Sequence, residues 1–162
     1  EIIFSLENNL MGVYVYRITT DYTYQSSIRN REFDNEWLSL EKNGKITIKG
    51  SHKKGYAWDG CSPKWKIKDM YFGTPEAVLN YTSRRSKTFY ASLIHDAFYQ
   101  FSKELNPIVG RKEIDSEFLI ILESDTFPPK KLYYWAVRLL GWWSWYRFRR
   151  PFFKSNNSIS QS

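Results

Sequence analysis

The stretch WLSLEKNGKITIKG, residues 37–50, decides the fold of the first half of the chain. Apolar and polar residues alternate on both sides of Asn43-Gly44, and an Asn-Gly pair between two alternating runs is the strongest short-range signal for a β-hairpin. The earlier runs GVYVYRIT (residues 12–19) and YTYQ (residues 22–25) alternate in the same way. The pattern predicts an antiparallel β-sheet in the N-terminal part of the chain.

The second half of the chain has the character of helices separated by prolines. Helical segments are expected at roughly 86–104, 110–124 and 130–146, with breaks at Asn106-Pro107 and Pro128-Pro129 and a stop at Pro151. A sheet followed by three helices is the order of an α+β fold.

The length of 162 residues fits one domain, which we expect to span residues 1–150. The polar end at 151–162 is expected to be a disordered tail. Since Met11-Gly12 follows ten residues after the start, residues 1–10 are expected to be a leader or an upstream extension. We expect no membrane span, because no apolar run reaches eighteen residues, and no signal peptide, because no basic start is followed by an apolar stretch and small residues.

The net charge of +7 is concentrated near the C-terminus. Residues 128–154 hold seven of the 24 basic residues and no acidic one, so the rest of the chain, with 17 acidic residues, is balanced. Ten residues of this segment are aromatic. Rings interleaved with basic groups suit a membrane surface or a protein assembly, and single-stranded nucleic acid and plain core packing are the weaker alternatives. The residues expected to make the contact are Trp135, Trp142, Trp143, Trp145, Arg147, Arg149 and Arg150.

The stretch ASLIHDAFYQF, residues 91–101, places an imidazole and a carboxylate side by side in an apolar helical segment. Tyr99 follows His95 by four residues, so the two share a helix face, whereas Asp96 lies about 100° away. On the next predicted helix, Asp115 lies on a largely apolar face where an unpaired carboxylate is costly. Since helices joined by a short loop are normally antiparallel neighbours, we expect Asp115 to face His95. The second imidazole nitrogen is then a base.

The loop GYAWDGCSPKW, residues 55–65, supplies a second group of candidate residues. We expect Asp96 to bind a cation together with the Asp59 carboxylate and loop carbonyls, that of Gly60 among them. Hard oxygen ligands favour Ca²⁺. Since the chain has only two histidines, we expect no zinc. We also expect no nucleotide cofactor. Asp59 is equally well an Asx-turn residue. The loop residues expected near the site are Trp58, Cys61 and Ser62.

Alternatives stay open for these residues. The polar groups can form a satisfied network that only fixes helix packing, and Asp115 can pair with Arg111 one turn earlier. Cys61 is either a small buried residue or, with His95, a nucleophile pair. A His-Asp metal phosphohydrolase needs a further histidine on an upstream helix, whereas His52 lies in a strand and turn context.

The pattern HDxxY, with a later Asp followed three residues on by Phe, resembles the catalytic helix pair of phospholipase A2 enzymes. The resemblance implies that His95 activates water, that Asp96 binds Ca²⁺, and that Tyr99 and Asp115 orient the histidine. It covers about thirty residues. The candidate calcium loop YAWDGCSPK differs from that of the family in glycine content and spacing, and the disulfides of the secreted forms are absent.

A second resemblance covers residues 56–141. The order WDGxSxP, HDxxY, a downstream Asp and Phe, and then WAVRLLG at 135–141 is similar to phage and prophage proteins catalogued as domain of unknown function 1353. This family usually has Ala where this chain has Cys61. The resemblance implies a viral origin, with the virion or the host cytoplasm as location.

Two functions are therefore expected from the sequence. The first is a calcium-assisted His-Asp hydrolase of the phospholipase A2 kind, acting on a lipid or another ester. The alternative is a non-catalytic tail or capsid-associated virion component, whose aromatic and basic C-terminal segment docks on other phage structural proteins or on a membrane surface.

Overall fold

The structure, a computed structural model, describes residues 16–58, 66–67, 70–71, 79 and 85–146. In the last range the side chains of five residues are left out of the description: Leu140, Trp142, Trp143, Ser144 and Tyr146. Antiparallel strands from the N-terminal region precede the helices, which confirms the α+β class. The predictions for residues 1–10 and 151–162 lie outside the described residues.

A four-stranded antiparallel sheet has the order β2-β5-β4-β3. Its strands are β2 (Tyr22–Gln25), β3 (Phe33–Asp34), β4 (Leu38–Leu40) and β5 (Lys45–Ile48). The predicted hairpin joins β4 to β5, with Leu40 opposite Ile46. Gly44 has φ +85°, and a Cβ there would collide with the Arg29 guanidinium and the Ile28 carbonyl. Only glycine fits this turn.

Two smaller pairs of strands are also present among the described residues. β1 (Tyr16–Ile18) pairs antiparallel with β6 (Tyr56–Trp58), so Tyr16 lies opposite Trp58. β7 (Lys66–Ile67) pairs with β8 (Met70–Tyr71). The run predicted at residues 12–19 is thus a strand in its described part.

The helices are α1 (Phe89–Gln100), α2 (Ser102–Leu105), α3 (Arg111–Ser124) and α4 (Lys130–Tyr146). The second and third predicted helices are confirmed within one residue at each end. The first is shorter and is divided. It begins later because Ser86 Oγ accepts from the Thr88 amide at 3.2 Å and competes with helical bonding. It breaks at Phe101, whose backbone angles (φ −100°, ψ 19°) are not helical. With this break, Phe101 and Leu105 are both buried.

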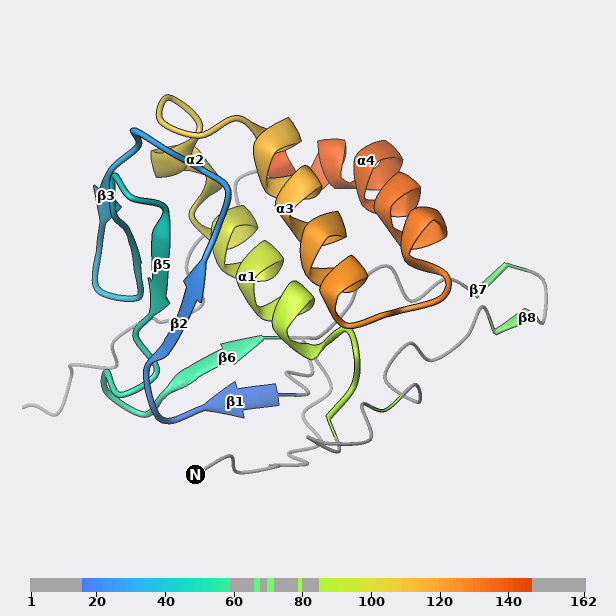
Figure 1. Cartoon of the computed structure of the whole chain (residues 1–162), viewed down its shortest axis with the longest axis horizontal. Helices are drawn as coiled ribbons and strands as arrows, with labels where there is room; N and C mark the ends of the chain where they lie inside the picture. Colours follow the sequence, from blue (N-terminus) through green and yellow to red (C-terminus); the bar gives the residue numbers. More distant parts are fainter. Residues whose placement is uncertain (1–15, 59–65, 68–69, 72–78, 80–84, 147–162) are drawn as a thin grey trace, which may run out of the picture.

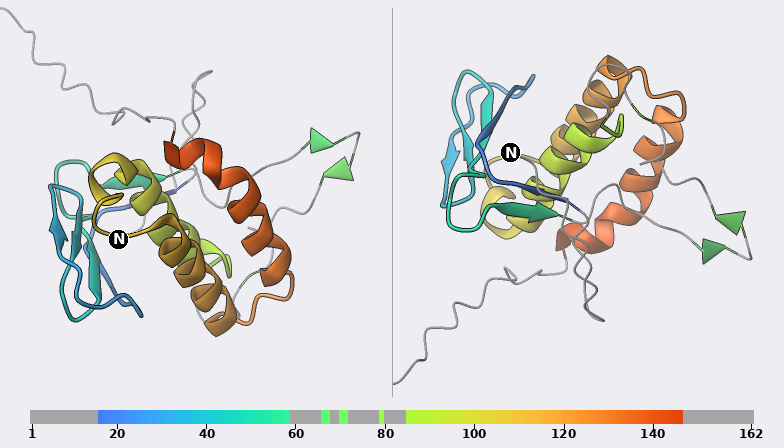
Figure 2. Two further views of the ribbon diagram at one scale, coloured as in Figure 1. Left: turned by 90° about the horizontal axis from the view of Figure 1, so that it is seen from above. Right: turned by 90° about the horizontal axis from the view of Figure 1, so that it is seen from below.

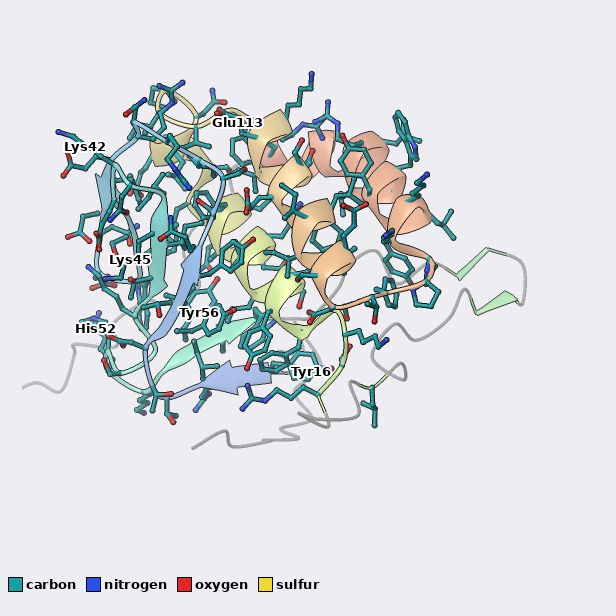
Figure 3. The ribbon with its side chains drawn as sticks, in the orientation of Figure 1. Tyr16, Lys42, Lys45, His52, Tyr56 and Glu113 are labelled. Atoms are coloured by element: carbon teal, nitrogen blue, oxygen red, sulfur yellow. The ribbon has the colours of Figure 1, made fainter. Side chains whose placement is uncertain are left out.

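The helices lie beside one another on one side of the strands, in the order α1, α3, α4 away from the four-stranded sheet (Figures 1 and 2). The main core fills the space between them. Leu38, Leu40, Ile46 and Ile48 alternate with more exposed residues, are at most 1% exposed, and share one cluster with the buried face of α1. Tyr56, labelled in Figure 3, links the layers by donating to Gln100 Oε1 at 2.8 Å.

Helix length and hydropathy also bear on membrane insertion. Within the described ranges, no helix combines enough length with enough apolar character to cross a bilayer.

Candidate functional site

The centre of the candidate site is the carboxylate of Asp115, which α3 carries against α1. Its side chain is fully buried. Oδ1 accepts from Tyr99 Oη at 2.6 Å and lies 3.1 Å from His95 Nε2. Oδ2 accepts from Arg138 Nη1 at 2.8 Å. The pairing of Asp115 with His95 that the helix hairpin predicts is confirmed, and the structure brings the three proposed catalytic residues together.

The local sequence explains this arrangement. The four-residue spacing of His95 and Tyr99 stacks their rings, with centroids 4.1 Å apart and planes inclined by 29°. Phe118, three residues after Asp115 on α3, packs against the imidazole with centroids 5.0 Å apart. The start of α3 is held by Glu113 Oε2, which accepts from the Gly110 amide at 2.9 Å. Packing on two sides therefore fixes the plane of the His95 ring.

The hydrogen bond defines the tautomer of His95. An ionised carboxylate only accepts, so Nε2 carries the proton that points at Asp115. In the neutral ring the lone pair is then on Nδ1. This atom lies 3.8 Å from Asp96 Oδ1. The His95 side chain is 9% exposed and that of Asp96 is 22% exposed, so Nδ1 lies on the side of the ring that faces the more exposed residue.

The charges within the cluster reinforce one another. Burial lowers the pKa of His95, but the hydrogen bond to Asp115 and the neighbouring Asp96 outweigh it, and the pKa lies above its ordinary value. Burial raises the pKa of Asp115, yet the hydrogen bonds from His95, Tyr99 and Arg138 hold that pKa below its usual range. Burial, together with the Asp115 charge, raises the pKa of Tyr99. Asp115 is therefore a carboxylate at neutral pH, and Tyr99 is a phenol that donates to it.

Arg138 is a member of the site that sequence reasoning missed. It also accepts, through its backbone carbonyl, a hydrogen bond of 3.0 Å from Arg111 Nη1. The Arg111 guanidinium lies 3.9 Å from Asp115 Oδ2, so the one-turn ion pair left open as an alternative is present beside the His95 bond. One signal was available: Arg138 is the single charged residue in the apolar run 132–146.

The candidate cation site is described only in part. Asp96 lies beside His95 Nδ1 as stated, whereas Asp59, Gly60, Cys61 and Ser62 fall outside the described residues. Among the residues that are described, no group of three or more His, Cys, Asp or Glu is placed to hold a metal ion.

Trp58, which was predicted to lie in the loop 55–65, lies instead in the strand β6. It is the last described residue of β6, is 2% exposed, and donates from Nε1 to Ser92 Oγ at 3.1 Å. Ser92 lies on α1, three residues before His95. Trp58 is therefore a core residue, bonded to the helix that carries the histidine.

The C-terminal aromatic residues divide into two groups. Trp135 is 59% exposed, as a surface-binding residue should be. Trp145 is 4% exposed, and the prediction that it contacts a membrane or partner is wrong. Its ring packs edge-on against Tyr99 at 5.0 Å, and its Nε1 donates to Asn106 Oδ1 at 3.0 Å. The side chains of Trp142 and Trp143, and residues Arg147, Arg149 and Arg150, lie outside the description.

A second buried carboxylate, Glu117, was not predicted. It is 1% exposed, and its oxygens accept from Tyr24 Oη at 2.7 Å, from the Ser27 amide at 3.1 Å and from Ser27 Oγ at 2.6 Å. These contacts tie α3 to β2 and the turn after it. Since the partners lie some 90 residues away along the chain, no local sequence signal marks them.

His52, the other histidine, lies far from this cluster. It packs edge-on against Trp37 with centroids 4.8 Å apart, beside Glu36 at 3.4 Å. Figure 3 labels it at the outer edge of the strands, away from α1 and α3. The arrangement required for a His-Asp phosphohydrolase, in which a second histidine approaches His95, is not formed.

Comparisons with known proteins add no assignment. A scan against protein-family models, a search of curated proteins and a search of solved structures each found no match.

Proposed function

We propose that the protein is a hydrolase of the phospholipase A2 kind, in which His95 and Asp115 cleave a lipid or another ester. The observation that carries the proposal is the carboxylate of Asp115 bound at once to His95 Nε2 and Tyr99 Oη. This is the relationship that the resemblance to phospholipase A2 implies for the same residues. A histidine held in one tautomer by a buried carboxylate is a recurrent acid-base group.

The chemistry follows from the position of Nδ1. In the neutral ring, Nδ1 takes a proton from water while the water oxygen attacks the ester carbonyl carbon. When the tetrahedral intermediate collapses, the bond to the leaving oxygen breaks, and that oxygen receives the proton from Nδ1. Asp115 stabilises the imidazolium that forms between the two steps. Tyr99 supports Asp115 and, through ring stacking, the plane of the imidazole.

Calcium is part of the proposal, and Asp96 is its proposed ligand. The described chain offers one hard oxygen donor beside Nδ1, which fits Ca²⁺ better than zinc. Asp59 and the Gly60 carbonyl are the proposed further ligands, and Trp58, the residue before them, donates to Ser92 on α1. When bound, the cation would polarise the ester carbonyl. A viral origin, with the virion or the host cytoplasm as location, belongs to the same proposal and rests on the resemblance to the phage family.

The first experiment is a calcium titration by calorimetry on the wild type and on Asp96→Asn, with Asp34→Asn, an exposed aspartate of the sheet, as the matched control. We expect binding in the wild type and in Asp34→Asn and none in Asp96→Asn. Calcium should also raise the melting temperature wherever it binds. Absence of binding in the wild type would remove calcium from the proposal.

The second experiment measures hydrolysis of phospholipid vesicles and of a soluble carboxylic ester. His95→Gln should reduce turnover by about 10²-fold to 10⁴-fold, the usual contribution of an acid-base group. His52→Gln replaces the other histidine, outside the site, and should leave turnover unchanged. Equal turnover in the wild type and His95→Gln, with both folded by circular dichroism, would refute the hydrolase.

A second candidate function is the non-catalytic virion component, associated with a tail or capsid. It is favoured by the complete pairing of Asp115, whose oxygens are shared among His95, Tyr99 and Arg138 as in a network that only fixes helix packing. Such a protein would show no turnover and no thermal response to calcium. It would copurify with particles of the phage through its C-terminal segment.

A further inference from the structure

α4 presents apolar side chains on two opposite sides. Val137 and Trp145 are 3% and 4% exposed on the inner side, which packs against α3 and, through Tyr99, against α1. On the outer side Leu132, Trp135 and Leu139 are 56%, 59% and 72% exposed. Their spacing of three and four residues places them on one helix face, and we call them the outer stripe.

This exposure is unusual for a helix at the surface of a globular protein. Such a helix normally has a polar outer face, and large apolar residues exposed in a row indicate a contact surface. Figures 1 and 2 show α4 as the outermost helix, with α3 on its inner side. Among the described elements, α4 makes its main contacts with α3 and α2.

The charge around the outer stripe selects its partner. Lys130 and Lys131 precede the stripe, and Lys131 is exposed, while Lys130 lies 3.5 Å from Glu123 on α3. Arg138, the other described basic residue of α4, is turned inward to Asp115 and does not contribute to this surface. A second copy of the chain would set the two lysines against their own counterparts, which is unfavourable. An anionic surface complements them.

We propose that the outer stripe docks on an anionic lipid surface, with α4 lying in the plane of the headgroups. Trp135 would lie at the boundary between headgroups and acyl chains, where an indole buries its ring and keeps its N–H near polar groups. Lys131 would reach the phosphates. A helix of 17 residues is about 25 Å long. Flat binding suits α4, since its exposed apolar side chains lie along one face of the helix.

The inference goes beyond the proposed hydrolase, because docking needs no bond cleavage. The test therefore uses ether-linked lipids, which have no ester for the enzyme to cut. The protein is sedimented with vesicles of ether-linked phosphatidylcholine, with and without ether-linked phosphatidylglycerol. The stripe variant is Trp135→Ser/Leu139→Ser, and the charge variant is Lys130→Gln/Lys131→Gln. Leu79→Ser, an apolar residue 51% exposed elsewhere, is the matched control.

We expect the wild type and Leu79→Ser to sediment with the phosphatidylglycerol vesicles and not with phosphatidylcholine alone. The stripe variant should lose roughly tenfold or more in partition coefficient, because two large apolar side chains no longer enter the interface. The charge variant should bind more weakly, and wild-type binding should fall with added salt.

Three outcomes would overturn the inference. One is a wild type that does not sediment with either vesicle. Another is a stripe variant that binds as tightly as the wild type. The third is self-association of the wild type in analytical ultracentrifugation that the stripe variant loses, since the stripe would then join two copies of the chain. None of these outcomes bears on hydrolysis, which His95→Gln tests separately.

Discussion

The hydroxyl of Tyr99 occupies the space that a side chain at Gly141 would need. A Cβ built on Gly141 would lie 2.6 Å from Tyr99 Oη and 3.0 Å from Cε1. The α4 backbone thus lies close to Tyr99, whose ring stacks on His95 and whose hydroxyl donates to Asp115. This contact lets a small change on α4 test the rigidity of the site.

Gly141→Ala should destabilise the protein. In an open helix the same change stabilises by up to about 1 kcal/mol. Here Tyr99 is held by stacking and by its hydrogen bond, so it cannot move aside cheaply, and overpacking of this kind costs about 1–3 kcal/mol. Urea denaturation measures the change in the free energy of unfolding. The cost should be smaller in a Tyr99→Phe background, where the nearest atom is gone. A Gly141→Ala protein more stable than the wild type would show that Tyr99 is loosely held.

Asp115 should make stability depend on pH in the acid range. Its pKa in the folded protein lies below the ordinary value of 3.8, so its contribution is complete above that pH and is lost as the pH falls toward the folded-state value. Asp115→Asn should lose about 3–5 kcal/mol at neutral pH, because it leaves the positive partners of a buried carboxylate unpaired. Thermal melts between neutral pH and pH 3 should show a shallower acid decline in the variant.

Asp125 provides the contrast for that measurement. Burial raises its pKa, with Lys87 opposing, so its contribution is present at low pH and is lost as the pH rises through the folded-state value. Ionisation of Asp125 therefore lowers the stability of the wild type as the pH rises from acid to neutral. In Asp125→Asn this decrease should be smaller. An equal effect of both substitutions on the pH profile would contradict the assigned directions.

Arg138→Met should destabilise by about 1.5–3 kcal/mol, the usual value of a hydrogen bond to a charged group. The methionine keeps most of the apolar stem, but Asp115 Oδ2 loses its donor at 2.8 Å and retains only Arg111 at 3.9 Å. Arg138→Lys restores the charge and should recover part of the loss. Chemical denaturation of the three proteins measures it. Equal stability of wild type and Arg138→Met would mean that Arg111 moves in to replace Arg138.

Glu117→Gln should cost about 1–3 kcal/mol, since an amide nitrogen cannot accept the hydrogen bonds that the buried carboxylate now accepts from Tyr24 and Ser27. Glu123→Gln on the same helix is the matched control, because its ion pair with Lys130 is partly exposed and is worth little. The two midpoints in urea are compared directly. The idea fails if Glu123→Gln is the more damaging change.

The sequence predicted what local chemistry controls. The turn at Asn43-Gly44 needs a backbone that only glycine tolerates, and prolines separate the three long helices, so these elements were foreseen. The pairing of His95 with Asp115 was also foreseen, because a short connection makes α1 and α3 neighbours. The break at Phe101 was not, since it follows from burial of Phe101 and Leu105 and not from a helix-breaking residue.

What escaped prediction depends on the rotation of α4 about its own axis. Composition showed that the segment is aromatic and basic but not which of its faces turns inward. Arg138, Gly141 and Trp145 follow at intervals of three and four residues and share the inner face. On this inner face Gly141 lies close to Tyr99 and Trp145 is buried, whereas Trp135 lies on the outer face and is exposed.

One turn of α4 connects the surface of the protein to its buried carboxylate. Arg138 lies immediately before Leu139 and three residues after Trp135, so a rigid turn carries outward and inward groups together. A displacement of this turn by a partner on the outer stripe would also move Arg138 relative to Asp115 Oδ2. Amide hydrogens of residues 135–139 should therefore exchange together with those of α3 around Asp115, as one cooperative unit.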